Sequence, residues 1–464
     1  MSSKNIALSD IPRRAISKSA AERLAWPAAV VLMMVALLGP ALWNGFPLIF
    51  ADTGGYVLRP FEGTLDIGRS ALYGAFLAAA IPLEFWPNLL LQAALAVWII
   101  VLTLRTHLHT LQPAVAVMVV LGLTLATSLP WTVSELMPDI FLLMAALALH
   151  LLAFPAPRLR VIEIAGLYAI IAFAIASHMT TLAVALALLV AYALIGLSAS
   201  RLLLPRPRLA GAATAIGAGI ALALTSNAII AGQFAFTPGG PNFLFGRLVQ
   251  DGIVGRYLER VCPDPTLRIC PYRNALPAST DDWMWWSDSP LFKLGGWREF
   301  TPEAERIIIG TLVSDPLTHI TTAVRDSLQQ LVTLDTGDGI NPDNTQHAVW
   351  ALSQVAPHAM PRFEAAAQQK NLFDFTVINR IDVPLALLAT AALPFILVGL
   401  RRRRPAAAAL ALSAFLALLS NAAICGIFSG PNTRYQSRLV PIAALAVLVA
   451  ALQRGREPRF EPPR

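Results

Sequence analysis

The chain has 464 residues, of which 56% are hydrophobic and only 14% are charged, and its mean hydropathy is +0.61. Soluble domains carry about a quarter charged residues, so this composition excludes an ordinary soluble protein and predicts a polytopic membrane protein. The net charge of +7 would favour nucleic acid as a partner of a soluble protein. Here the basic residues lie between apolar runs, where they set membrane topology, so we expect no nucleic-acid partner.

The N-terminal 25 residues are basic and precede an apolar run that begins at Trp26. This order is typical of a secretory signal, but the run is longer than a usual signal core and no A-x-A cleavage site follows it. We therefore expect an uncleaved anchor with a cytoplasmic N-terminal tail. The predicted location is the inner membrane of a bacterium.

Ten apolar runs of about 17–24 residues are long enough to cross a hydrocarbon core of about 30 Å. They lie near 26–45, 88–104, 112–129, 138–154, 161–177, 179–198, 209–232, 381–400, 406–427 and 437–453. The predicted fold class is an all-α membrane protein with about ten transmembrane helices.

An eleventh segment, 69–86, is also apolar, and the charges decide how to treat it. If it does not cross, the arginine clusters that separate the later runs all lie in the cytoplasm, as the positive-inside rule favours. If it crosses fully, all of these clusters except the first move outside. We therefore predict a re-entrant or juxtamembrane helix on the outer side, with both chain termini in the cytoplasm.

The long segment between the seventh and eighth runs is polar and rich in Pro and Trp, and it shows no period-two alternation. A mainly helical periplasmic domain is expected there, with helices beginning near Thr301 and covering 316–334 and 361–371. The predicted parts are a cytoplasmic tail (1–25), an N-terminal transmembrane module with the first outer loop (26–232), the periplasmic domain (233–380), C-terminal transmembrane helices (381–453) and a cytoplasmic tail (454–464).

Two of the three cysteines, Cys262 and Cys270, lie in this outer segment. Because the outer side of a bacterial envelope is oxidising, a disulfide between them is predicted. A zinc site would need further ligands nearby, and none is evident in the sequence. Cys425 lies within an apolar run and is interpreted as a buried thiol.

The most informative stretch is 46–73, just after the first run, because its glycines and prolines predict a loop and it contains Asp52. Asp52 is either an Asx-turn residue or a general base or ion ligand. Tyr56 would hydrogen-bond to Asp52 or flank a ligand, and Arg69 would pair with either Asp52 or Asp66.

Three more ionisable residues fall on the predicted outer face. Glu135 and Asp139 lie between the third and fourth crossings, and Asp139 begins a run, where a helix dipole favours a negative charge. Carboxylates at a membrane face are also candidates for function. His178 lies in a short outer turn and is either a structural hydrogen-bonding residue or part of the same site.

Arg434, Tyr435 and Arg438 precede the last crossing. Arginines on the outer side oppose the positive-inside bias, so their presence there indicates a specific role. A guanidinium at a membrane face suits a phosphate through paired hydrogen bonds, and the alternative is a salt bridge to the outer domain. The sequence has no Walker A, H-E-x-x-H, C-x-x-C or G-x-S-x-G motif. Any reaction must therefore use a donor that does not require a soluble nucleotide-binding pocket.

In their order along the chain, these elements resemble the GT-C superfamily of integral-membrane glycosyltransferases, over about 26–200 and 381–453. Asp52 matches the catalytic carboxylate of the first outer loop. The stretch 69–73 stands in place of a short proline-containing helix, although it lacks the prolines, and Arg105 ends the next crossing. Met137–Ile140 resembles the Pro-Asp opening of a later span, and Arg434-Tyr435 resembles a late Arg-Tyr element.

This resemblance implies sugar transfer, generally with inversion, from a polyprenyl-phosphate donor to an envelope lipid, glycan or protein on the periplasmic face. Asp52 would deprotonate the acceptor hydroxyl, and Arg434, with Arg438 or Arg69, would hold the leaving phosphate. A divalent metal such as Mg²⁺ or Mn²⁺ is left open as a cofactor, and no metal site is assigned. The implied substrate-binding residues are Tyr56, Arg69, Tyr73, Glu135, Asp139, His178, Arg434, Tyr435 and Arg438.

Three other readings remain open. An O-antigen ligase or polymerase would need residues of the outer segment, such as His319, Arg325 or His347. A lipid or glycan transporter would favour repeats and midplane charges. A non-catalytic assembly protein would bind a partner through its outer domain. The tryptophans of the stretch DDWMWW serve any of these, as a sugar platform, a membrane anchor or a domain core.

Overall fold

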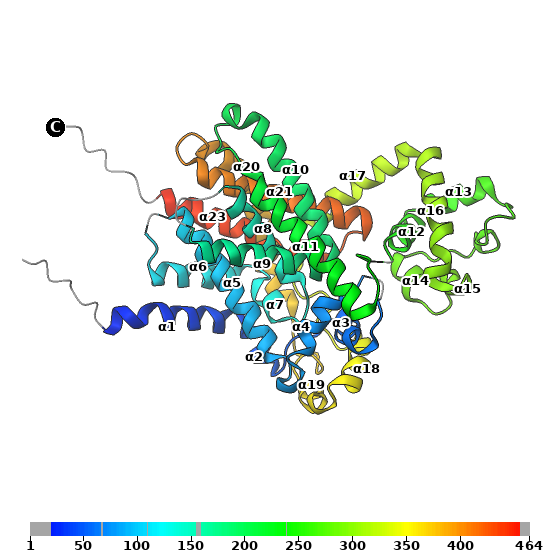
Figure 1. The fold of residues 1–464 in the computed structure, drawn as a ribbon, viewed down its shortest axis with the longest axis horizontal. Helices are drawn as coiled ribbons and strands as arrows, with labels where there is room; N and C mark the ends of the chain where they lie inside the picture. The colour runs from blue at the N-terminus through cyan, green and yellow to red at the C-terminus, as the bar shows by residue number, and fades with distance from the viewer. Residues whose placement is uncertain (1–19, 66–67, 109, 155–158, 238, 455–464) are drawn as a thin grey trace, which may run out of the picture.

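The computed structural model describes residues 20–65, 68–108, 110–154, 159–237 and 239–454. These residues form an all-helical protein (Figure 1), which confirms the all-α class. Within this described part of the chain, the only β pairing is an isolated bridge between Leu48 and Glu135. The hydrophobic core lies mainly in a bundle formed by both ends of the described chain.

In the described part of the chain, six helical segments are long and apolar enough to cross a membrane, which supports a multi-pass membrane protein. They are α5 (Trp86–His107), α10 (Met179–Leu202), α11 (Leu209–Ala231), α20 (Phe375–Leu400), α21 (Pro405–Phe428) and the segment Thr433–Gln453, which contains α22 (Thr433–Ser437) and most of α23 (Pro441–Arg454). A bent pair, α16 (Gly296–Ser314) and α17 (Pro316–Val332), makes the number seven if it counts as one span. The described residues therefore support six or seven candidate spans, and the count of ten crossings stays a prediction.

The other four predicted runs form shorter apolar helices. They are α1 (Ala20–Leu37), α6 (Pro113–Ala126), α8 (Asp139–Ala153) and α9 (Val161–Ser177). The first run is interrupted because Pro40 lacks an amide hydrogen, so the helix restarts as α2 (Gly39–Asn44). Every residue of α8 is buried, and α5, α9, α10 and α11 pack around it. This central position explains why α8 is apolar on all sides.

The first outer stretch is more helical than expected. Asp52 lies in the first turn of α3 (Ala51–Glu62) instead of in a loop, so that expectation was wrong. The glycines serve close packing: a Cβ on Gly54 would lie 2.8 Å from the Cα of Ala348, and one on Gly74 would lie 2.3 Å from the carbonyl oxygen of Tyr56. The segment predicted to be re-entrant forms α4 (Ala71–Ala78) and a 3₁₀ turn, η1 (Ile81–Leu83).

A separate hydrophobic cluster organises the first half of the long outer segment, which Figure 1 shows as a lobe at one end of the molecule. Its helices are α12 (Gly240–Gln250), α13 (Ile253–Val261), α14 (Thr280–Trp285), α15 (Pro290–Lys293) and α16, with the 3₁₀ turn η2 (Cys270–Tyr272). A disulfide joins Cys262 to Cys270 within this lobe. The prediction that a helix begins at Thr301 was wrong, since α16 begins five residues earlier and the Thr301 hydroxyl donates to the carbonyl of Trp297.

The second half of the outer segment packs on the bundle. Helix α17 lies along α21, and α18 (Gln346–Val355) packs against α3. Two 3₁₀ turns, η3 (Asp343–Thr345) and η4 (Pro357–Ala359), flank α18, and α19 (Met360–Ala365) follows η4. Arg247 of the lobe pairs with Asp326 of α17, with both side chains buried. The domain boundaries at 233 and 380 stay predictions.

Candidate functional site

A cavity of about 660 Å³ lies where α3, the outer lobe and the ends of α10 and α21 meet. Six of the residues singled out from the sequence line it: Asp52, Tyr56, Arg69, His178, Arg434 and Tyr435. They come from four separate parts of the chain. Most of the predicted site residues therefore line a single cavity.

Backbone pairing brings Asp52 close to the start of α8. The amide of Leu48 donates to the carbonyl of Ser134, and the amide of Leu136 donates to the carbonyl of Leu48, both at 2.9 Å. The hydroxyl of Thr53, next to Asp52, donates to the carbonyl of Leu136 at 3.1 Å. These bonds fix the start of α3 beside the turn that leads into Asp139.

The charged side chains form an alternating row. Arg69 donates to Asp52 at 2.5 Å, and Arg434 Nη2 lies 3.7 Å from the other Asp52 oxygen. Arg434 Nε lies 4.0 Å from Asp139, which accepts a 2.7 Å hydrogen bond from Arg438. Three guanidinium groups share two carboxylates in this row. The row therefore places the Arg69 and Arg434 guanidinium groups at the cavity, whose wider lining also includes the carboxylates of Asp281 and Asp338.

The turn that carries Arg434 is held from two sides. The side chain of Asn432 caps α22 by accepting from the Arg434 amide, and Gln330 of α17 exchanges two hydrogen bonds with the Asn432 backbone. The Arg434 guanidinium lies 4.0 Å from the centroid of the Phe50 ring, and its Nη1 is buried without a hydrogen-bond partner among the described residues. Arg434 is therefore fixed in place and retains donor capacity for a ligand.

Four predicted residues lie behind the cavity wall. Asp139 and Arg438 are each 1% exposed and pair with one another. Tyr73 is buried against Tyr56 and donates to Gln92, whose amide donates to the carbonyl of Glu135. None of the four lines the cavity, so their contacts support the lining residues from behind. Burial raises the pKa of the Glu135 carboxyl to about 8.

Several lining residues were missed from the sequence. Trp285 and Asp281 face the cavity from α14, one helical turn apart, and Asp338 and Asn344 face it from the segment between α17 and α18. The stretch DDWMWW is conspicuous in the sequence, but the sequence does not indicate which tryptophan ring faces a cavity. Trp283 is fully buried in the lobe, whereas the Trp285 ring lies 5.5 Å from the Arg69 guanidinium. The sequence around Asp338 and Asn344 contains no motif that indicates a functional site.

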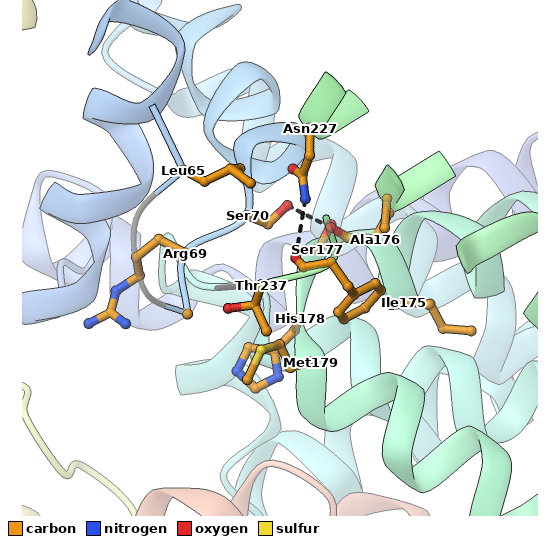
Figure 2. A pocket seen from close by; sticks show the side chains of 13 residues that line it. Leu65, Arg69, Ser70, Ile175, Ala176, Ser177, His178, Met179, Asn227 and Thr237 are labelled. Atoms are coloured by element: carbon orange, nitrogen blue, oxygen red, sulfur yellow. Dashed lines mark hydrogen bonds between the residues drawn. The ribbon is translucent and has the colours of Figure 1, made fainter. Parts of the chain in front are cut away.

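A second, much smaller pocket lies beside the first. Figure 2 shows Ser70, Ser177, His178 and Thr237 around it, and its volume is about 20 Å³. Ser70 donates to the carbonyl of Ala176 at 2.6 Å, which ties the start of α4 to the end of α9. The pocket has room for roughly one water molecule. It is too small for a substrate, so the larger cavity is the candidate site.

The carboxylates do not suit a metal site. Among the described residues, no three His, Cys, Asp or Glu side chains come together as metal ligands. Asp52 and Asp139 each hold an arginine instead.

The cavity combines three kinds of wall. Met179, Ala183, Ile424 and Phe428 make it apolar near the ends of α10 and α21. The arginine–aspartate row follows, and the outer lobe adds acidic and aromatic groups. Such a cavity suits an amphiphile whose polar head lies at the arginine–aspartate row. No protein-family model, curated protein or solved structure matches the chain.

Proposed function

We propose that the protein is a membrane glycosyltransferase that moves a sugar from a polyprenyl-phosphate donor to an envelope acceptor. The observation that carries the proposal is that Asp52, Arg69 and Arg434 line one cavity that also has an apolar wall. A carboxylate base and two guanidinium groups are the groups that such a transfer needs. The order of these residues along the chain matches the GT-C resemblance.

In this proposal all ten apolar helices cross the inner membrane of a bacterium, and both termini lie in the cytoplasm. The positive-inside rule then places the arginine-rich turn at 401–404 in the cytoplasm. It places the cavity and the lobe on the periplasmic side. A donor carried by a lipid reaches this cavity by diffusing in the bilayer, so no nucleotide site is required.

The walls of the cavity divide the donor into parts. The polyprenyl chain lies along the apolar side chains at the ends of α10 and α21, including Ile424 and Phe428. The phosphate lies at Arg434 and Arg69, because a guanidinium offers paired donors to phosphate oxygens. The sugar then lies toward Asp52 and the outer lobe.

The acceptor hydroxyl attacks the anomeric carbon as the bond between that carbon and the phosphate oxygen breaks. Asp52 takes the hydroxyl proton, and polyprenyl phosphate leaves with the electron pair of the broken bond. Arg434 and Arg69 stabilise the negative charge that grows on the leaving phosphate. Attack from the face opposite the phosphate inverts the anomeric configuration.

The ligase or polymerase reading is the runner-up. It relies on His319, Arg325 or His347, and none of these three lines the described cavity. Arg325 instead pairs with Asp326 and Asp251, and the His347 ring stacks on Trp350. These contacts favour Asp52 as the reacting group. A lipid or glycan transporter would use the same cavity without bond cleavage, so only an assay of transfer separates the two.

The test is Asp52→Asn, which keeps the size of the side chain and removes the base. Transfer of labelled sugar from polyprenyl phosphate to membrane acceptors, with and without a chelator, should fall about 10²–10⁴-fold. Glu62→Gln is the matched control, because Glu62 lies on the same helix but outside the cavity. Arg434→Lys should also reduce transfer, since lysine keeps the charge but loses the paired donors.

Two results would contradict the proposal. Near-normal transfer by Asp52→Asn, together with an essential residue in the outer segment, would favour the ligase reading. Absence of transfer from every lipid-linked donor tested would remove the enzyme assignment itself.

A further inference from the structure

Helix α17 has its polar and apolar faces reversed relative to a helix of a soluble domain. Five apolar side chains spaced three or four residues apart are each between 54% and 69% exposed: Leu317, Ile320, Val324, Leu328 and Val332. In a soluble domain the apolar stripe of a helix faces the core. An exposed stripe of this length needs a partner that is itself apolar.

The opposite face of α17 carries two buried polar residues, while Arg325 at its edge is exposed. Asp326 is 2% exposed and pairs with Arg247, and Gln330 is fully buried and bonds to the backbone of Asn432. Polar side chains that point inward and apolar ones that point outward are the pattern of a helix that faces lipid. The sequence places this helix in the outer domain, where such a pattern is not expected.

We infer that α17 lies in the bilayer, with its apolar stripe against the lipid acyl chains. The position of α17 identifies lipid as the partner of the stripe. Helix α17 packs along the candidate span α21 and so continues the surface of the membrane bundle. The end of α16 extends the same surface with Leu312 and Val313, which are 46% and 79% exposed.

This position gives α17 a role at the site. Gly426 of α21 approaches Asp326 so closely that a Cβ would lie 2.6 Å from the Asp326 carbonyl oxygen. Ile424 and Phe428 line the cavity and lie one turn apart on α21, on a different face from Gly426. The outer end of α21 is therefore held between the cavity and α17. The lipid-embedded helix supports this wall and, through Gln330, the turn that carries Arg434.

The experiment measures collision of a spin label with oxygen, which partitions into lipid, and with a water-soluble nickel chelate. Single cysteines replace Ile320 and Val324 in the full-length protein in lipid nanodiscs, with Cys425→Ser as background. Val398→Cys on α20 is the lipid control, since Val398 is 60% exposed on a candidate span. Asp288→Cys in the exposed segment between α14 and α15 is the aqueous control.

Labels at 320 and 324 should resemble the label at 398, with oxygen collisions exceeding nickel collisions several-fold. Nickel collisions at both positions as frequent as at 288 would overturn the inference. Leu328→Cys provides a third site if either variant fails to fold. The readout needs no transferase activity, so the result is independent of the proposed function.

Discussion

Asp139→Asn tests the role of the row of charges behind the cavity. Asp139 and Arg438 are each 1% exposed and lie 2.7 Å apart. The substitution keeps the shape of the side chain but leaves Arg438 buried without its counter-ion. Removal of one partner of a buried pair costs about 3–5 kcal/mol, and we expect the free energy of unfolding to fall by that amount. Arg434 is affected less, because Asp52 still lies 3.7 Å away.

The assay is SDS-induced unfolding in mixed micelles, completed as a double-mutant cycle. The double variant Asp139→Leu/Arg438→Met removes both charges, so it should lose far less stability than Asp139→Asn. Glu84→Gln is the control. Its partner Arg362 is 68% exposed, and a pair of this kind contributes about 0–1 kcal/mol. A loss below about 1 kcal/mol for Asp139→Asn, or a double variant as unstable as the summed single variants, would refute the reasoning.

Three further outcomes are expected. Reporter fusions at Arg206 should report cytoplasm and those at Gly337 periplasm, and a cytoplasmic signal at Gly337 would contradict the topology. Cys262 and Cys270 should resist thiol labelling until they are reduced, and ready labelling without reductant would argue against the disulfide. Loss of the short ring that the disulfide closes should destabilise the lobe by about 2–3 kcal/mol without preventing membrane insertion. Because burial raises the pKa of Glu135 to about 8, the folded state binds more protons than the unfolded state between the unperturbed pKa and that value. Stability should therefore fall as the pH rises through this window, and Glu135→Gln, measured by pH-dependent unfolding, should remove the fall; an unchanged pH profile would show that another group is responsible.

Hydropathy and charge determined the class of this protein and the positions of its apolar helices. Each of the ten predicted runs overlaps a helix, although the first run is divided between α1 and α2. A run of apolar residues is a local property that needs no tertiary contact. The ionisable cavity-lining candidates Asp52, Arg69 and Arg434 were also visible, because charged residues beside apolar runs are candidates for function. Glycine and proline misled the prediction at Asp52, where Gly54 allows a helix to approach another closely.

Only the tertiary structure decided how these residues meet. Asp52 and Arg434 are distant in the sequence, and their 3.7 Å contact depends on backbone bonds from Leu48 to the 134–136 turn and on the cap at Asn432. The structure also separated Asp52 at the cavity from Asp139 behind it, and it turned the apolar stripe of α17 outward. Contacts of this kind depend on the packing of helices against one another, which periodicity within one helix does not encode.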